Sequence, residues 1–152
     1  MKKKSKYKPK GIRLDAVNWV LSGIKPISKV GDALITLKAK NHSAFTEITQ
    51  GRGNHDQVDI LIASMNMCEA YARNGKGKDW LPEIMQAQDA LFTMGKRGLT
   101  KGRFLFTGEE MQAMNLGMEI HDAQLDQSTV KEMEDMMDYV MKQIRQKKAR
   151  AI

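Results

Sequence analysis

The sequence predicts an all-α protein, and two observations carry that prediction. Apolar residues recur at steps of three and four, which keeps them on one face of an α-helix. Capping residues precede several of these repeats, and glycines follow them. The 152 residues suffice for one domain with its own core. We expect a bundle of four long helices at residues 54–73, 79–97, 107–126 and 129–149, after shorter helices at 12–22, 28–40 and 43–50.

The helix at 129–149 has the clearest pattern. Thr129 and Glu132 have the spacing of a capping box, in which a hydroxyl and a carboxylate satisfy unpaired backbone N–H groups. Acidic residues lie toward its N-terminal end and basic residues toward its C-terminal end, which suits the helix dipole. The apolar seam that we expect to face the rest of the bundle consists of Val130, Met133, Met137, Val140 and Ile144.

The helix at 107–126 begins with a second capping-box pair, Thr107 and Glu110. Its apolar surface is wide, which predicts contacts on two sides. The chain has 12 methionines, many of them in the last two helices. Flexible thioether side chains suit both core filling, which we favour, and an adaptable groove for a partner or for a second copy in a homodimer.

Local signals also mark the earlier helices. Asn54 is placed to cap the helix at 54–73, and Asp79 to cap the helix at 79–97, with residues 98–102 expected as a loop. Gly23 and Pro26 separate the first two N-terminal helices. A helix-turn-helix is an alternative there, but its small and apolar residues do not fall at the spacing that the motif needs.

Positive charge is concentrated at the two ends of the chain. The formal net charge is +7, yet residues 1–13 hold seven bases and no acid, and residues 142–152 hold five bases and no acid. The sequence between them is therefore net acidic. Residues 1–11 have almost no apolar content, so we expect a disordered basic tail, with residues 12–152 as one helical domain. Such a tail suits contact with polyanions, although a tail that only improves solubility remains the alternative.

A second basic feature depends on helix direction. If the four long helices alternate, as short connections favour, residues 51–53, 95–103 and the C-terminus share one end of the bundle. We call the residues expected there the basic pole; they are Arg52, Lys96, Arg97, Lys101, Arg103, Arg145, Lys147, Lys148 and Arg150. The basic tail adds Lys2, Lys3, Lys4, Lys6, Lys8, Lys10 and Arg13 to the predicted nucleic-acid-binding residues.

No complete catalytic or metal-binding motif is present. Residues 53–56 (GNHD) match one block of the metallophosphoesterase signature, but its other blocks are missing, and we expect Asn54 to act as a helix cap. His121 and Cys68 fall on apolar faces, which favours core positions. The acidic strip of Glu119, Asp122 and Asp126 is expected to be solvated. We therefore predict a non-enzymatic protein without catalytic residues, metal or cofactor.

Compartment signals are also lacking. The chain has one cysteine, no apolar stretch of a secretory signal and no run of about twenty apolar residues. We expect a cytoplasmic protein that does not contact membranes.

Residues 8–15 (KPKGIRLD), 19–23 (WVLSG) and 119–126 (EIHDAQLD) resemble small proteins encoded by phages and prophages of proteobacteria, a group with no established function. The resemblance implies an accessory protein of a mobile element in a bacterial host cell. We expect it to bind nucleic acid or a nucleoprotein complex through the basic tail and pole. The alternative is a protein–protein inhibitor or adaptor against a host complex, such as an anti-defence protein of the anti-CRISPR kind.

Overall fold

The structure is a computed structural model that describes residues 30–146, with side chains from residue 33 onward. This part of the chain is all-α, as predicted, and has no strand. A 3-10 turn, η2, covers Lys78–Trp80. The α-helices are α2 (Val30–Thr49), α3 (His55–Arg73), α4 (Leu81–Lys101), α5 (Gly108–Asp126) and α6 (Val130–Arg145). The expected basic tail at 1–11 and the expected helix at 12–22 lie outside the described residues.

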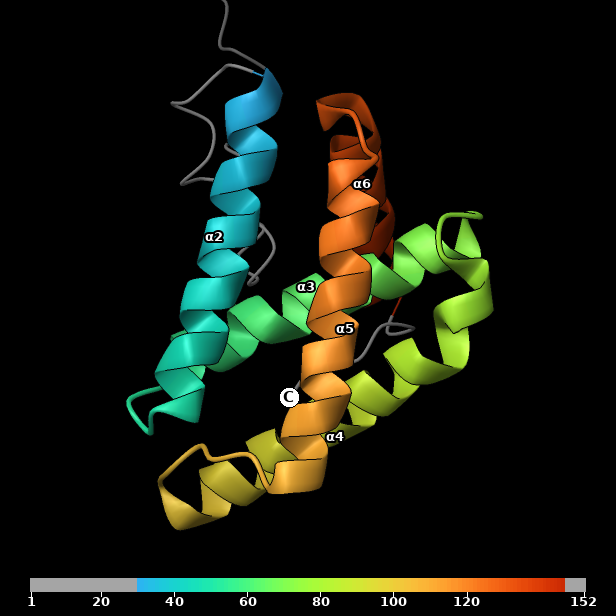
Figure 1. The fold of residues 1–152 in the computed structure, drawn as a ribbon. Helices are drawn as coiled ribbons and strands as arrows, with labels where there is room; N and C mark the ends of the chain where they lie inside the picture. Colours follow the sequence, from blue (N-terminus) through green and yellow to red (C-terminus); the bar gives the residue numbers. More distant parts are fainter. Residues whose placement is uncertain (1–29, 147–152) are drawn as a thin grey trace, which may run out of the picture.

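Helix α3 is the centre of the fold. Residues 60–68 are buried without interruption, so this helix has no solvent face along its middle. It packs against α2, α4, α5 and α6. In Figure 1, α2 and α5 run side by side while α3 crosses behind them and α4 crosses below. A helix that is apolar on all sides is stable only when other helices surround it.

This arrangement differs from an alternating bundle of four long helices. Helix α6 packs mainly on α3 and α2, although only a three-residue turn joins it to α5. The short connections therefore did not decide the packing. The packing instead follows from α3, whose apolar surface on every side has to be covered by neighbouring helices.

Two helix boundaries were predicted wrongly. The expected helices at 28–40 and 43–50 form one helix, α2, and Asn41, which lies at the expected break, is buried. Helix α4 runs to Lys101 through the expected loop. Gly98 stays helical because the Phe104 ring packs where a Cβ would otherwise stand, and the helix ends at Gly102 with φ +74°.

The capping predictions are confirmed at Asn54 and Thr107, where both bonds of a capping box form. Thr129 also caps its helix by accepting from the Glu132 backbone N–H. The Glu132 carboxylate does not complete the box, because it binds Lys76 Nζ at 2.7 Å. Asp79 does not cap α4; it lies within the 3-10 turn, and Trp80 holds the N-cap position without a side-chain bond.

Most of the methionines in the last two helices fill the core. The buried ones are Met114, Met118, Met133, Met137 and Met141. The described structure therefore favours core filling over an exposed methionine groove. Within residues 30–146, no helix combines the length and apolar character that crossing a membrane requires.

Candidate nucleic-acid interface

The α2–α3 loop (residues 50–54) and the α4–α5 loop (residues 102–107) lie together, and we call this the two-loop end. The Arg103 guanidinium is so close to Gly51 that a Cβ built there would stand 2.6 Å from Nη2. Figure 1 shows both loops at the lower end of the view, where α2 ends and α5 begins. The sequence-based expectation that these two loops meet is therefore met.

Aromatic packing holds the two loops in place. The Phe104 ring covers Gly98, whose ideal Cβ would be only 2.1 Å from a ring carbon, and contacts His55 edge-on with centroids 5.4 Å apart. Phe106 packs on Phe45 of α2 at 5.7 Å between centroids. Apolar rings thus anchor the loop that carries Arg103, which limits how far this side chain can move.

Arg97 is used within the fold. Its guanidinium makes a bidentate contact with Glu110, at 2.5 and 3.0 Å, and donates to the Leu105 carbonyl at 2.8 Å. The hydrogen bond from Arg97 holds the pKa of the Glu110 carboxyl below its ordinary value. Glu110 also accepts from the Thr107 backbone N–H, so one ion pair joins α4, the loop and the start of α5.

Arg52 is paired as well. Its Nε and Nη2 atoms lie 3.1 and 2.8 Å from the Glu47 carboxylate oxygens. This contact lowers the pKa of Glu47, and both side chains face solvent, so a stronger anion can compete for Arg52.

Three cations at the two-loop end remain available. Lys96, Lys101 and Arg103 are exposed, and no ion pair within the described residues involves them. Two leucines accompany them, with Leu99 48% and Leu105 39% exposed. Gly98 and Phe104, the chain neighbours of these leucines, are in contact with each other. The surface offers positive charge and apolar area together.

No family model, curated protein or solved structure matches this chain.

The C-terminal end of α6, where the sequence placed the rest of the basic pole, is not part of the two-loop end within the described residues. In Figure 1 the dark red part of α6 lies well above the lower end of the view, where the two loops are. Its position follows from the packing of α6 on α3 and α2. Predicted binding residues outside the described part of the chain are Lys2, Lys3, Lys4, Lys6, Lys8, Lys10, Arg13, Lys147, Lys148 and Arg150.

His121 occupies a core position, as the sequence predicted. It is 1% exposed, and burial lowers its pKa. Its Nδ1 lies 3.0 Å from Gln124 Oε1, while Gln124 Nε2 donates to the carbonyls of Cys68 and Lys76. Because Oε1 can only accept, the proton of the neutral ring is on Nδ1. Cys68 is buried too, and burial raises the pKa of its thiol, which makes the thiolate scarce.

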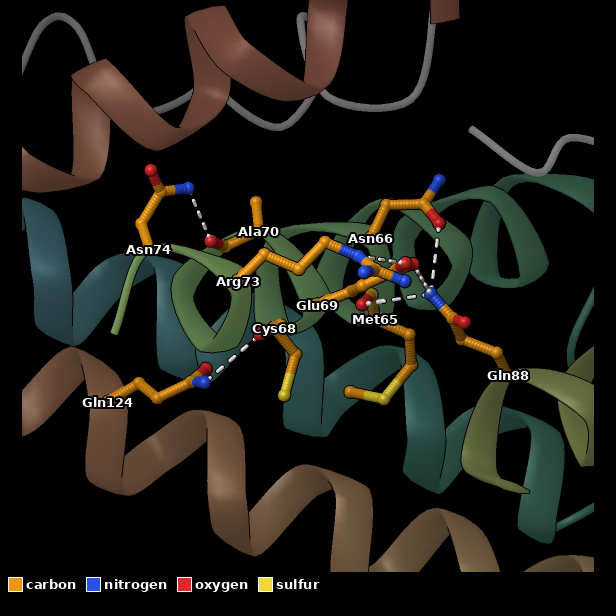
Figure 2. Close-up of polar contacts among 9 residues, drawn as sticks. All are labelled: Met65, Asn66, Cys68, Glu69, Ala70, Arg73, Asn74, Gln88 and Gln124. Atoms are coloured by element: carbon orange, nitrogen blue, oxygen red, sulfur yellow. Dashed lines mark hydrogen bonds and ion pairs between the residues drawn. The ribbon is translucent and has the colours of Figure 1, made fainter. Parts of the chain in front are cut away.

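Buried amides form a polar network that the sequence did not reveal. Gln88 of α4 points at α3, where its Nε2 donates to Glu69 at 2.7 Å and contacts Asn66 and the Met65 carbonyl at 3.4 Å (Figure 2). Glu69 in turn pairs with Arg73 at 2.8 Å. Helical periodicity could have shown only that Gln88 shares a face with Ile84 and Leu91. The network positions α4 on α3.

The acidic strip of α5 is also partly paired, which the sequence did not predict. Asp122 Oδ2 is 2.5 Å from His42 Nε2, and Asp126 Oδ1 is 2.6 Å from Lys38 Nζ. The partners are 80 or more residues away in the chain, so no local pattern signals them. Among the described side chains, no group of three or more His, Cys, Asp or Glu could hold a metal ion.

Proposed function

We propose that this chain is a non-enzymatic accessory protein that binds nucleic acid or a nucleoprotein complex. Separation of charge supports the proposal most directly. Residues 30–146 contain 13 Lys and Arg against 17 Asp and Glu, whereas the rest of the chain contains 12 Lys and Arg and one acid. An acidic domain with strongly basic ends suits phosphate contact through those ends.

The two-loop end is a secondary contact in this proposal. Arg52 and Arg97 are paired with glutamates, so Lys96, Lys101 and Arg103 supply most of its available charge. Three cations release few counterions compared with the basic tail. Binding should therefore depend mainly on the tail, with a smaller contribution from these three residues.

Titration of labelled duplex and single-stranded oligonucleotides at several salt concentrations tests the proposal. If about six phosphates are contacted, affinity should fall on the order of a thousandfold between 50 and 200 mM salt. Deletion of residues 1–11 should remove most binding at low salt. Absence of binding at low salt, or binding that the deletion does not change, contradicts the proposal.

Charge reversal separates the tail from the two-loop end. Changing Lys96, Lys101 and Arg103 together to Glu should weaken binding several-fold and reduce the salt dependence. The matched control changes Lys78, Lys131 and Arg73 to Glu, because these exposed cations give the same change in net charge away from the two-loop end and from both basic ends of the chain. Equal losses in both triple variants show a general charge effect and remove the two-loop end from the interface.

The second candidate function is a protein–protein inhibitor or adaptor against a host complex, for example an anti-defence protein of the anti-CRISPR kind. Exposure of Leu99 and Leu105 beside three cations favours it, because apolar centres with charged rims are typical of protein interfaces. A host complex should then still co-purify with the chain after nuclease treatment of the lysate. The double variant Leu99→Ser, Leu105→Ser should abolish this co-purification. Ile35→Ser is the matched control, because Ile35 on α2 is an apolar side chain of the same size and is 66% exposed.

The cellular setting is part of the same proposal. The resemblance of residues 8–15, 19–23 and 119–126 to phage and prophage proteins supports a role inside a bacterial host cell. A homodimer through the Met-rich helices has less support, since the methionines of their inner faces are buried within one copy.

A further inference from the structure

A small cavity lies where α2, α3 and α6 meet. Its volume is about 10 Å³. Every side chain around it is buried, and the wall is largely apolar. The residues on which the argument rests are Leu37 and Asn41 of α2, Ile60, Ser64 and Met67 of α3, and Met137 of α6.

Asn41 is the exception in this wall. It is 1% exposed, and neither its Nδ2 nor its Oδ1 has a hydrogen-bond partner among the described residues. It stands in the middle of the inner seam of α2, between Leu37 and Ala44. Burying an amide without partners costs free energy, whereas an apolar side chain at this position would not. The amide therefore needs a partner from the cavity.

Ser64 supplies a second polar atom. Its Oγ donates to the Leu61 carbonyl at 2.8 Å, so its hydrogen is already used and its oxygen can still accept. The cavity is thus bordered by one amide that can donate or accept and by one hydroxyl oxygen that accepts. A ligand that joins the two has to donate to Ser64 Oγ while it donates to, or accepts from, Asn41.

We propose that one water molecule is bound in this cavity and bridges Asn41 to Ser64, tying α2 to α3. A cavity of about this size accommodates roughly one water, and nothing larger. Water is the small ligand that both donates and accepts. A metal ion cannot donate to Ser64, and no carboxylate borders the cavity to compensate its charge. The bridge gives α2 a fixed register on α3, as a buried polar residue does in a helix seam.

A crystal structure of the full chain tests the site directly. We expect an ordered solvent peak within hydrogen-bond distance of the Asn41 amide and Ser64 Oγ. An empty or collapsed cavity, or an Asn41 amide that turns to another partner, overturns the proposal.

A double-mutant cycle tests the bridge itself. Asn41→Leu replaces the amide with a similarly branched apolar group that displaces the water, and Ser64→Ala removes the hydroxyl. Loss of the Ser64 bond to Leu61 occurs in both backgrounds and cancels in the cycle. We expect Ser64→Ala to lower the Tm by a few degrees more in the natural chain than beside Asn41→Leu.

Additive Tm changes overturn the bridge even if both variants fold well. The control cycle pairs Ser64→Ala with Asn115→Leu, an exposed position on α5, and should be additive. Should Asn41→Leu fail to fold, Asn41→Ala takes its place in the same cycle.

Discussion

At the two-loop end and at the opposite end of the domain, where the α3–α4 loop meets the α5–α6 turn, a paired cation joins neighbouring segments. The two ends differ in how many other cations remain unpaired within the described residues. At the two-loop end, Arg97 pairs with Glu110 and the Leu105 carbonyl, while three other cations stay exposed. At the opposite end, Lys76 donates to the Gln127 carbonyl, Ser128 and Glu132, which fastens the α3–α4 loop to the α5–α6 turn.

The comparison shows that a basic residue in a glycine-rich stretch of sequence is not by itself a binding residue. Arg97 and Lys76 have similar sequence surroundings, with glycines and further lysines nearby. Both became structural because carboxylates and open carbonyls face them in the fold. Lys96, Lys101 and Arg103 have no such partner within the described residues. Nearby acids, rather than the number of bases, decide what is left for a ligand.

The largest expected effect is at the two-loop end, for Gly98→Ala. The new Cβ would overlap the Phe104 ring, so the ring and its loop have to move. We expect a loss of about 2–3 kcal/mol in the free energy of unfolding, as for other overpacked cores. Urea denaturation measures it. Gly108→Ala is the control, because nothing lies within 4 Å of its Cβ and alanine favours helix, so it should be neutral or stabilising.

Two further variants compare the Arg97–Glu110 pair of the two-loop end with the Lys76–Glu132 pair of the opposite end. Glu110→Gln should cost about 1–2 kcal/mol, because it leaves Arg97 without its charged partner and weakens the cap at Thr107. Lys76→Met should cost less, roughly 1 kcal/mol, because Glu132 is half exposed and can be hydrated again. Unfolding midpoints of both variants give the comparison. A larger loss at Lys76 would reverse the ranking of the two ends.

Local signals in the sequence predicted the elements of this fold better than their packing. Caps at Asn54 and Thr107 and apolar periodicity located α3 and α5 to within a residue or two, because both act over a single helical turn. The failures have long-range causes. Phe104 keeps Gly98 helical, and Asn41, at the expected break in α2, is buried, so each outcome depends on another element.

The candidate interface shows the same limit. Composition identified the basic ends of the chain, and loop positions indicated that residues 51–53, 95–103 and the C-terminus would share one end. Gly51 and Arg103 do lie together. Pairing of Arg52 with Glu47 could have been suspected from their separation of five residues. The contacts of Arg97 with Glu110 and of His42 with Asp122 could not, because they join different helices.

Acid pH should lower the free energy of unfolding through His121. Burial lowers the pKa of His121 in the folded chain, and its Nε2 has no partner among the described residues. As the pH falls below about 6.5, His121 becomes protonated in the unfolded chain but stays neutral in the folded chain. The unfolded state then binds more protons than the folded state, so the free energy of unfolding decreases. Above that pH the His121 contribution is fully present.

Urea denaturation between pH 5 and 7.5 measures this effect. The free energy of unfolding should fall toward pH 5 with a slope of at most about 1.4 kcal/mol per pH unit from His121. His121→Gln should flatten the slope, and an unchanged slope in that variant contradicts the prediction. Glu110 adds little to this slope, because its contribution is lost mainly below the ordinary pKa of a glutamate, about 4.3, where the unfolded chain takes up a proton that the lowered pKa of Glu110 keeps off the folded chain.

The smallest expected effect is at the surface pair between Lys38 and Asp126, which joins α2 to the end of α5 at 2.6 Å. Asp126 is 62% exposed, so water screens the attraction and hydrates either partner alone. Lys38→Met and Asp126→Asn should each change the free energy of unfolding by less than about 1 kcal/mol, and a double-mutant cycle should show little coupling. The contrast with Glu110→Gln is the informative part, since that pair has a similar length but a carboxylate only 12% exposed. Strong coupling at Lys38 would mean that α2 is held by its surface charges rather than by its buried seam.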